Sequence, residues 1–271
     1  MPELPEVETT RRGLEPLLVG RTVRSVRVHN RSLRWPVPRG IAKTLAGERV
    51  RAIDRRSKYL LVRCMHGTLI IHLGMTGHLR VIPAAEPLRK HDHVELLLDD
   101  GRALRFNDSR RFGALLWTKD DPLVHPLLTG LGPEPFDGAF TDSYLAGRAK
   151  GRVVAVKPFL MDAKTVVGVG NIYASEALFR AGIDPRRAAG KVSRPAWQKL
   201  VTAVREVLAE AIEAGGTTIR DFANSAGEPG YFRISLRVYG RGGEPCLTCS
   251  TPVKQVRLGQ RSTYFCAKCQ K

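Results

Sequence analysis

The stretch Cys246-Leu-Thr-Cys249, separated by 16 residues from Cys266-Ala-Lys-Cys269, carries four of the five cysteines in this chain of 271 residues. Each Cys-x2-Cys pair can form a tight turn that supplies two thiolates, and the residues between the pairs are numerous enough for a β-hairpin that brings the pairs together. We therefore predict a β-hairpin around one tetrahedral Zn²⁺. Because all four ligands are cysteines, no coordination position stays open, and we expect a structural rather than a catalytic metal.

Two disulfides are the alternative for these cysteines, and a cytoplasmic setting disfavours them. Three basic residues, Lys254, Arg257 and Arg261, lie between the pairs and would project from the hairpin as phosphate-binding groups. The module thus favours a nucleic-acid partner without showing that the protein is an enzyme.

The segment before this module has the period of helices. Apolar residues recur at intervals of three and four between Leu200 and Ile212, with Ser193 as a candidate N-cap and Gly215-Gly216 as the stop. A shorter helix is predicted from Ile172 to Ala181. Ahead of both, the Gly/Pro-rich segment 130–138 is typical of a linker.

The N-terminal half has the pattern of strands. Apolar runs occur at Tyr59 to Val62, Thr68 to Leu73 and His93 to Leu98, and the Asp99-Asp100-Gly101 turn leads into Ala103 to Phe106. Asp-Gly between apolar runs predicts a hairpin whose two turn residues both take positive φ. Several short strands at this spacing suggest a sandwich or a barrel.

The composition favours a polyanionic partner. The chain has 44 Lys and Arg against 26 Asp and Glu, a formal net charge of +18, and a field of this sign attracts nucleic acid or an anionic membrane. No basic amphipathic helix with an exposed apolar face stands out, which counts against a membrane surface. The chain shows no signal peptide and no apolar run near the ~18 residues of a membrane span, so we expect a cytoplasmic protein.

The first residues, Met1-Pro-Glu-Leu-Pro-Glu-Val-Glu8, admit two interpretations. Proline near a helix start and glutamates in its first turn are ordinary helix-initiation signals. If Met1 is removed, however, Pro2 offers a secondary amine that is partly neutral near pH 7 and can form an imine with an aldehyde-like carbon. Glu3 then lies beside it as an acid or base.

Three further features are ambiguous on their own. Gly168-Val-Gly170-Asn171 suits either an anion site at a helix start or a plain helix cap, and lacks the third glycine of a dinucleotide fingerprint. His91 and His93 share one face of a strand, for which we predict a polar surface rather than a metal site. Lys58, at the head of a strand, has the character of a solvated lysine, and Cys64 that of an inert buried thiol.

Taken together, these motifs resemble the formamidopyrimidine-DNA glycosylase family, and the resemblance runs the whole length of the chain. The matching motifs are Pro2-Glu-Leu-Pro-Glu-Val-Glu8, Ser57-Lys-Tyr-Leu-Leu61, His72-Leu-Gly-Met-Thr-Gly77, Lys90-His-Asp-His93, Arg110-Arg-Phe-Gly113, Val167-Gly-Val-Gly-Asn-Ile-Tyr-Ala-Ser-Glu176, Gly230-Tyr-Phe232 and the four-cysteine module. The opening Pro-Glu-Leu-Pro-Glu is similar to the branch of the family that acts on oxidised purines.

The resemblance implies a multidomain α+β fold with DNA bound between its two halves. The expected domains are a catalytic β-sandwich with an N-terminal helix at 1–132, a helix–two-turn–helix DNA-binding domain at 133–235, and a C-terminal zinc finger at 236–271. The cofactor would be one structural Zn²⁺ held by Cys246, Cys249, Cys266 and Cys269. The protein would act as a monomer on double-stranded DNA containing oxidised bases or abasic sites.

The resemblance also implies the chemistry. Pro2 would displace the damaged base by attacking C1′ of a flipped nucleotide, Glu3 would assist protonation and opening of the sugar ring, and Lys58 and Arg261 would act in β- and δ-elimination. Met75, Arg110 and Phe112 match residues that fill the gap left by the extruded base and probe the opposite base. His91, Arg110, Arg152 and Asn171 match DNA-backbone contacts.

Two other functions remain open from the sequence. An oxidised-pyrimidine glycosylase of the endonuclease VIII type would carry a related set of residues. A zinc-ribbon DNA-binding protein without catalysis would share the charge, the cysteines and Asn171, but would not need Pro2, Glu3, Lys58 or Arg261. Within the resemblance, Thr217–Tyr231 matches the lesion-recognition loop, and its middle is the least diagnostic part.

Overall fold

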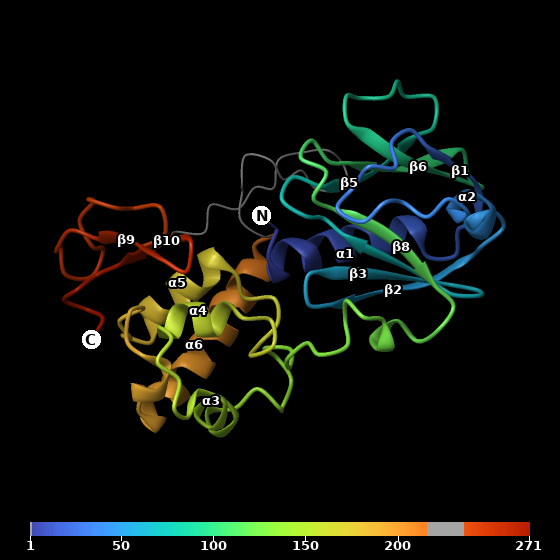
Figure 1. The fold of residues 1–271 in the computed structure, drawn as a ribbon. Helices are drawn as coiled ribbons and strands as arrows, with labels where there is room; N and C mark the ends of the chain where they lie inside the picture. The colour runs from blue at the N-terminus through green and yellow to red at the C-terminus, as the bar shows by residue number, and fades with distance from the viewer. Residues whose placement is uncertain (1, 216–235) are drawn as a thin grey trace. The chain divides into compact units, whose positions relative to one another are not determined.

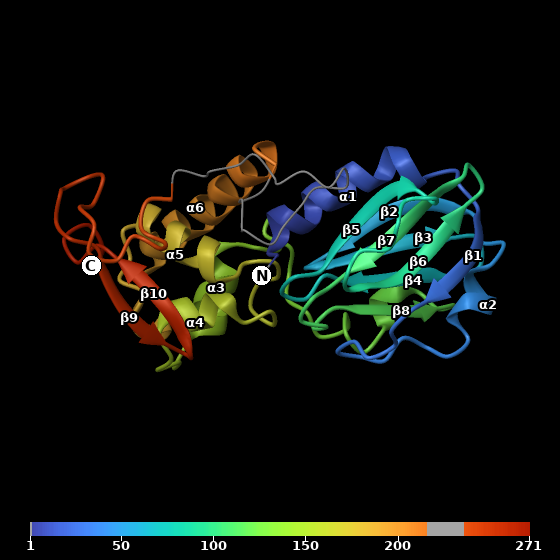
Figure 2. The ribbon, with the colours of Figure 1, turned by 90° about the horizontal axis from the view of Figure 1, so that it is seen from above.

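The computed structural model describes residues 2–215 and 236–271. These residues fall into two compact units, one within 2–130 and the other within 131–214 together with 236–271. Figures 1 and 2 label their helices and strands. The segment 216–235, which includes the predicted lesion-recognition loop Thr217–Tyr231, the motif Gly230-Tyr-Phe232 and Gly216 of the predicted helix stop, lies outside the described residues.

The first unit is a sandwich of two antiparallel four-stranded sheets, visible as two layers in Figure 1. One sheet has the order β2 (Val50–Arg56), β3 (Tyr59–Cys64), β4 (Thr68–His72), β8 (Ala114–Thr118). The other has the order β1 (Val23–Val28), β6 (Asp92–Leu98), β7 (Arg102–Asn107), β5 (His78–Pro83). One apolar cluster from both sheets forms the core, as expected for two inward-facing sheet surfaces. The predicted β-sandwich is confirmed.

Two helices pack against the sandwich. Helix α1 (Leu4–Leu18) contacts β2, β3 and β5, and therefore spans both sheets at one edge of the sandwich. Its buried face includes Leu4, Val7, Leu14 and Leu18, which recur at three, four and seven residues. The short helix α2 (Ile41–Leu45) contacts the edge strand β1. Each helix thus covers a strand edge that would otherwise be open to another chain.

The β6–β7 hairpin forms where the Asp-Gly signal predicts it, but its turn differs. Of the two residues expected at positive φ, only Gly101 has it, with φ of 83°. The connection contains three residues between Leu98 and Arg102, and a three-residue loop needs a left-handed residue only at its last position. The prediction of two positive φ values was wrong because it assumed a two-residue turn.

The second unit is mostly helical. Its helices include α3 (Asp142–Ala149), α4 (Val156–Met161), α5 (Asn171–Arg180) and α6 (Arg194–Glu213). Short 3-10 helices lie at Ala189–Lys191 of this unit and at Pro122–Val124 of the first unit. Helix α6 begins after Ser193, whose Oγ accepts a hydrogen bond from the N–H of Ala196 at 3.4 Å, as the sequence predicts. The linker segment 130–138 contains no helix or strand. Among the described helices, none is long and apolar enough to cross a membrane.

The cysteine module contains the predicted hairpin, β9 (Lys254–Leu258) and β10 (Arg261–Phe265). Its two turn residues, Gly259 and Gln260, both have positive φ, which is the two-residue turn that suits a twisted hairpin. The apolar centre of the module includes Val238 and Val253, and Phe179 of α5 packs against it. The module is thus part of the second unit.

Strands β5, β6 and β7 of the first unit hold buried charges that the sequence does not reveal. Arg80 and Asp92 form an ion pair at 3.1 Å, and Arg105 and Glu95 form another at 2.6 Å. All four side chains are at most 2% exposed. Removing one member of such a pair would leave its partner as an unpaired buried charge, which costs several kcal/mol of folding free energy.

Candidate functional site

The N-terminal residues are fixed by the start of helix α1. Glu3 is the N-cap of the helix and only 2% exposed, and its backbone N–H donates to Oε2 of Glu6 at 2.8 Å. Pro2 is also buried. The helix-initiation interpretation is therefore correct as a description of the structure, and it holds Pro2 and Glu3 in one defined place.

Arg55 connects helix α1 to the turn that carries Lys58. Its Nε donates to Oε2 of Glu8 at 3.1 Å, and its Nη1 donates to the carbonyl of Ser57 at 2.9 Å. Burial alone would raise the pKa of Glu8, but the neighbouring arginines, foremost Arg11, hold it below its ordinary value. Lys58 lies half-buried in the two-residue turn between β2 and β3, where Ser57 has a left-handed φ of 57°. Lys58 stands at the head of β3, as the sequence predicts, but it is half-buried rather than fully solvated, and sequence reasoning missed the arginine that supports its turn.

His72 is a further residue at this site to which sequence reasoning gave no role. Its ring lies 4.7 Å from that of Tyr59, and its Nδ1 accepts a hydrogen bond from the N–H of Gly74 at 3.1 Å. Burial, followed by the positive charges of Lys58 and Arg34, lowers the pKa of His72 from 6.5 to about 4. The ring is therefore neutral at pH 7, and Nε2 carries its proton. In the sequence it stands at the polar end of an apolar strand and opens the motif His72-Leu-Gly-Met-Thr-Gly77, but neither feature indicates its buried, neutral ring.

This shifted pKa predicts a pH-dependent stability. As the pH falls from 6.5 towards 4, the unfolded chain protonates at His72 before the folded chain does, so folding loses free energy across that window and loses no more below it. We expect the wild type to lose about 2 to 3 kcal/mol more of unfolding free energy over this window than His72→Gln does. Urea unfolding at a series of pH values measures the difference, with exposed His29→Gln as the control. Equal pH slopes for wild type and His72→Gln would contradict the shift.

The structure brings Met75 and the Arg110–Phe112 segment together. Gly74, next to Met75, lies so close to the backbone of Phe112 that a Cβ at this position would clash. Cζ of Arg110 lies 4.9 Å from the ring centroid of Phe112, a cation–π contact, and Phe112 is 44% exposed. An open groove of about 490 Å³ lies beside them, lined by Ser32, Leu33, Arg34, Arg110, Arg111 and Phe112.

The two histidines around Asp92 do not share a polar surface, so that prediction was wrong. His93 is only 4% exposed, and its Nε2 lies 2.7 Å from the carbonyl oxygen of Asp108. His91 precedes β6 and has a left-handed φ of 73°. A residue in this conformation leaves the regular two-residue alternation, although the ring centroids of His91 and His93 still lie 6.2 Å apart in an edge-on arrangement. His91 is the half-exposed member of the pair.

In the second unit, Lys157 connects Asn171 to the zinc hairpin. Nζ of this buried lysine donates to Oδ1 of Asn171 at 2.6 Å, to Oγ1 of Thr263 at 2.8 Å and to the carbonyl of Ser262 at 3.0 Å. Lysine is seldom this buried without such acceptors. The sequence alone gives no indication of this role, because a lysine in a short apolar run has the character of a surface residue.

Asn171 also contacts the segment that leads into the cysteine module. Its Nδ2 donates to the hydroxyl of Tyr239 at 3.4 Å. Glu176, one turn further along α5, accepts hydrogen bonds from the backbone N–H groups of Arg237, Val238 and Tyr239 at 2.8 to 3.0 Å. The side chain of Asn171 is therefore held by Lys157 and Tyr239. It is not the cap of α5, because Gly170 is the N-cap.

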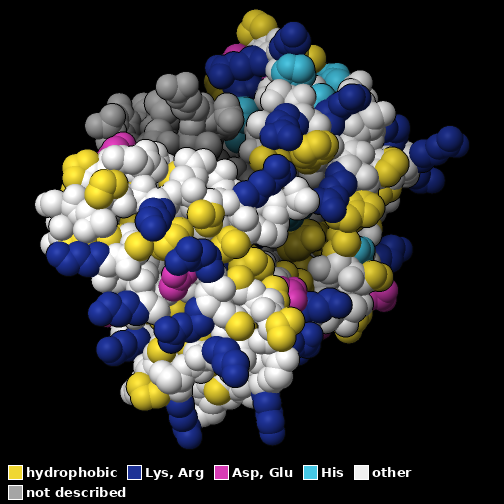
Figure 3. Space-filling view, turned by 60° about the vertical axis from the view of Figure 1, so that its left-hand side comes forward, with side chains coloured by type: hydrophobic (Ala, Val, Ile, Leu, Met, Phe, Trp, Pro, Cys, Tyr) yellow, Lys and Arg dark blue, Asp and Glu magenta, His cyan; other side chains and the backbone are white. Residues whose placement is uncertain are grey.

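Arg152 and Arg261 are exposed, as residues that bind a phosphate must be. Arg261 opens β10 directly after the hairpin turn, beside the residues that Lys157 binds. Lys254 and Arg257 are exposed on β9. Figure 3 shows many Lys and Arg side chains and few Asp and Glu on the face that it draws.

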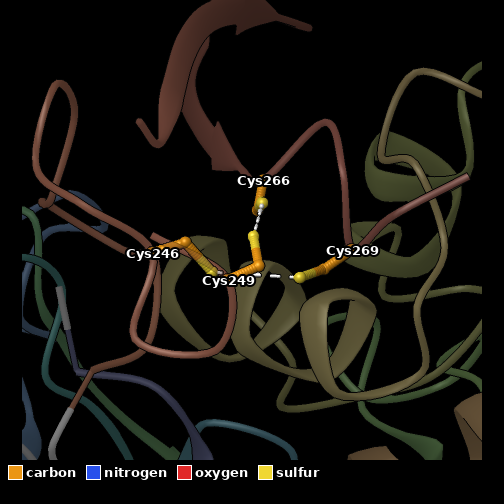
Figure 4. Close-up of side chains that lie close together, drawn as sticks. All are labelled: Cys246, Cys249, Cys266 and Cys269. Atoms are coloured by element: carbon orange, nitrogen blue, oxygen red, sulfur yellow. Dashed lines mark hydrogen bonds between the residues drawn. The ribbon is translucent and has the colours of Figure 1, made fainter. Parts of the chain in front are cut away.

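The four cysteines of the module converge on one point, as Figure 4 shows. Their sulfur atoms all lie within 4.8 Å of one another, with Sγ of Cys246 3.9 Å from Cys269 and Sγ of Cys249 3.4 Å from Cys266. A tetrahedron with Zn–S bonds of about 2.3 Å has S···S edges of about 3.8 Å. The donor set therefore fits one Zn²⁺, and the four thiols are free rather than paired in disulfides.

The fifth cysteine, Cys64, is separate from this site. It is 7% exposed at the end of β3, and burial, with a smaller contribution from Glu48, raises its pKa to about 12. A thiol with such a pKa is almost entirely protonated at pH 7, so it is inert as a nucleophile. The prediction of a buried, unreactive thiol is confirmed.

Known proteins match this chain over its whole length. Residues 1–115 match the formamidopyrimidine-DNA glycosylase N-terminal domain, residues 131–223 its H2TH domain, and residues 243–271 the zinc finger found in FPG and IleRS. The chain is similar to the formamidopyrimidine-DNA glycosylase of Stutzerimonas stutzeri, with 57% identity covering 100% of both chains.

Two solved structures show the same fold. The MutM (FPG) protein of Thermus thermophilus has 42% identity and a TM-score of 0.88, covering 99% of this chain and 98% of its own. A mutant FPG of Lactococcus lactis in complex with DNA containing Fapy-dG has 32% identity and a TM-score of 0.93, covering 100% of both chains. The helix–two-turn–helix domain and the zinc finger expected from the sequence are thereby confirmed, and the chain belongs to the formamidopyrimidine-DNA glycosylase family.

Proposed function

We propose that this protein is a DNA glycosylase and abasic-site lyase that removes oxidised purines, such as 8-oxoguanine and formamidopyrimidines, from duplex DNA. The observation that carries the proposal is the full-length match to formamidopyrimidine-DNA glycosylases by a chain that keeps Pro2 and Glu3 at the start of α1. The relatives' names favour this function over an oxidised-pyrimidine glycosylase and over a binding protein without catalysis. A relative of the same fold carries DNA with Fapy-dG, a ring-opened purine.

Once Met1 is removed, Pro2 supplies the nucleophile. Its nitrogen lone pair forms a bond to C1′ as the N-glycosidic bond breaks, and the departing base takes that electron pair and a proton. The nitrogen then loses its own proton, and its lone pair expels O4′ of the sugar to give an iminium. Glu3 supplies the proton that O4′ needs.

The start of α1 supports this chemistry. The partial positive charge at a helix N-terminus disfavours an ammonium at Pro2 and so favours the neutral amine that can attack. The fixed position of Glu3 as N-cap, 2% exposed, keeps a carboxyl group beside that amine with little contact to water. An acid and a nucleophile held in one place need no reorganisation during the reaction.

Strand cleavage follows from the iminium. Loss of a proton from C2′ breaks the C3′–O3′ bond, and a second elimination breaks the C5′–O5′ bond, after which water releases the sugar fragment from Pro2. We assign Lys58 to the first elimination and Arg261 to the second. The half-buried position of Lys58 and the exposed position of Arg261 on the hairpin suit a base near the sugar and a cation near a leaving phosphate.

The remaining residues bind and probe the duplex. Extruding a base costs a few kcal/mol of stacking, which apolar and planar groups can offset by filling the gap. Arg110 and Phe112 are exposed and contact each other, and the half-buried Met75 follows Gly74, whose backbone lies against that of Phe112. The DNA backbone is contacted by His91, Arg110, Arg152 and Asn171. The protein acts as a monomer with domains 1–132, 133–235 and 236–271. It works in the compartment that holds the DNA.

Borohydride trapping tests the proposal. We expect reduction in the presence of a duplex with 8-oxoguanine opposite cytosine to give a covalent adduct that peptide mapping places on Pro2. An adduct only with an abasic site or with thymine glycol would favour the pyrimidine branch or a weakened glycosylase. Zinc-loaded protein that forms no adduct with any of the three would refute the proposal in favour of DNA binding alone.

A further inference from the structure

Asp108 lies between the loops that carry Met75 and Phe112. It follows β7 directly, and its side chain is fully buried, with 0% exposure. Oδ1 accepts a hydrogen bond from Oγ1 of Thr76 at 2.6 Å, and Oδ2 accepts one from the backbone N–H of Gly113 at 2.8 Å. One carboxylate therefore binds the residue after Met75 and the residue after Phe112.

Thr76 continues this connection. Its hydroxyl donates its proton to Asp108 and accepts a hydrogen bond from the backbone N–H of Arg110 at 3.1 Å. A hydroxyl has one proton and two lone pairs, so these two contacts use its donor and one acceptor. Arg110 is thus linked to Asp108 through one side chain.

The backbone of Asp108 fixes a third segment. Its carbonyl oxygen lies 2.7 Å from Nε2 of His93, and its N–H donates to the carbonyl of His91 at 3.1 Å. The second bond holds the carbonyl of His91, the residue that has a left-handed φ of 73°. The three segments that carry His91, Met75 and Arg110–Phe112 therefore meet at a single residue.

The packing around the carboxylate leaves little freedom. A Cβ at Gly113 would lie 2.5 Å from the ring of Phe106, 2.8 Å from the carbonyl of His72 and 3.0 Å from Oδ2 of Asp108. Only glycine fits at this position, so the N–H of Gly113 approaches the carboxylate closely. Short hydrogen bonds to a buried carboxylate are about twice as strong as neutral ones, which makes the arrangement rigid.

We infer that Asp108 is a positioning residue that holds Met75, Arg110 and Phe112 as one unit, and thereby sets how the protein distinguishes the base opposite the lesion. This inference rests on the proposed function, since it concerns how the gap-filling residues enter DNA. Asp108 itself is fully buried, so it acts through the loops that it binds and not by reaching a ligand. Its effect is on geometry: the two loops must keep one relative position for an inserted side chain to meet the opposite base.

The chemistry of the carboxylate allows a sharp test. In Asp108→Asn the amide oxygen can still accept from the Gly113 N–H, and its NH2 can donate to the second lone pair of the Thr76 hydroxyl. Both links then lose the charge of the carboxylate, and the Thr76 proton loses its acceptor. Thr76→Val removes the link to Arg110 and leaves the bond to Gly113, while Thr76→Ser keeps both links. Glu95→Gln, at a buried, ion-paired carboxylate of the same sheet, is the matched control for loss of stability.

The first measurement compares excision of 8-oxoguanine opposite cytosine and opposite adenine. We expect the ratio of the two rates to fall about tenfold in Asp108→Asn, because both links lose their charged acceptor, and to fall less in Thr76→Val. Thr76→Ser should keep the wild-type ratio of the two rates. Glu95→Gln should lower the melting temperature and leave that ratio unchanged. Borohydride trapping on a preformed abasic site should be nearly unchanged in all four variants.

The second measurement needs no catalysis. A duplex with a tetrahydrofuran abasic analogue opposite 2-aminopurine reports unstacking of the opposite base by fluorescence, and Asp108→Asn should bind it with a smaller fluorescence increase than the wild type. Wild-type rate ratios and wild-type fluorescence in both Asp108→Asn and Thr76→Val would overturn the inference, as would an equal change in Glu95→Gln. A wild type that excises nothing would refute the proposed function instead, and the fluorescence comparison would still decide the role of Asp108.

Discussion

Replacing Pro2 by glycine is expected to reduce base release about 100-fold or more, because loss of a covalent nucleophile removes the reaction path that it serves. Glycine would still leave a terminal amine, but a primary one without the ring that fixes its direction at the start of α1. Binding to duplex DNA should stay nearly intact, since Pro2 is buried and carries none of the exposed cations. Single-turnover excision and a gel-shift titration measure the two properties.

Pro5→Ala is the matched control for this variant. Pro5 is also buried, and it occupies the first turn of the same helix, but its nitrogen is part of a peptide bond. A helix-start effect would appear in both variants, whereas loss of the nucleophile would appear only in Pro2→Gly. Unchanged excision by Pro2→Gly, or an equal loss in Pro5→Ala, would contradict the assignment of Pro2.

The elements that the sequence predicts well depend on local patterns. Helix α6 begins after Ser193 because a side-chain cap and the helical period both act within a few residues, and the β9–β10 hairpin follows from the spacing of the cysteine pairs. The turn after β6 shows the limit of such rules. An Asp-Gly signal gives the place of a turn, while the number of residues in the loop depends on the register of the strands it joins.

The positions that sequence reasoning missed all depend on long-range contacts. Lys157 binds Thr263 of the hairpin, 106 residues along the chain, and no local pattern marks it. His93 is a polar residue at the start of β6, and its burial becomes clear only once the carbonyl of Asp108 is found beside its ring. The roles of His72 and Arg55 likewise depend on neighbours brought near by the sheet. Local periodicity cannot indicate which polar side chain will find a buried partner.

The candidate site could be predicted from residue types rather than from local periodicity. The residue types at Pro2, Glu3 and the four cysteines limit the chemistry directly, because an N-terminal secondary amine and a closed thiolate set each have few uses. Arg152 and Arg261 carry no such restriction, since an exposed arginine can hold any phosphate. Their assignment rests on the order of the motifs around them, and the structure adds their exposure.

Removing the zinc is expected to unfold the hairpin and to weaken DNA binding steeply. Structural Zn²⁺ contributes about 10 to 16 kcal/mol of folding energy in zinc-finger peptides, and the apolar centre of this module contains two of the cysteines themselves, Cys246 and Cys266. The bonds from Lys157 to β10 and from Gln270 to the carbonyl of Ile183 connect the module to the helices, but they cannot replace its core. We expect Cys266→Ser to lose the metal and the order of the hairpin.

The salt dependence of DNA binding separates this effect from general unfolding. Lys254, Arg257 and Arg261 are exposed on the hairpin, and if each neutralises one phosphate, their loss makes the slope of log K against log salt shallower by up to about 2.7. Cys64→Ser, at a buried cysteine of the other unit, should keep one bound zinc and the wild-type slope. Zinc content, circular dichroism and salt titrations decide the outcome. If Cys266→Ser kept wild-type affinity and slope after complete zinc loss, the hairpin would have no part in holding DNA, and the cations that bind the backbone would have to be sought on the helices and the sandwich.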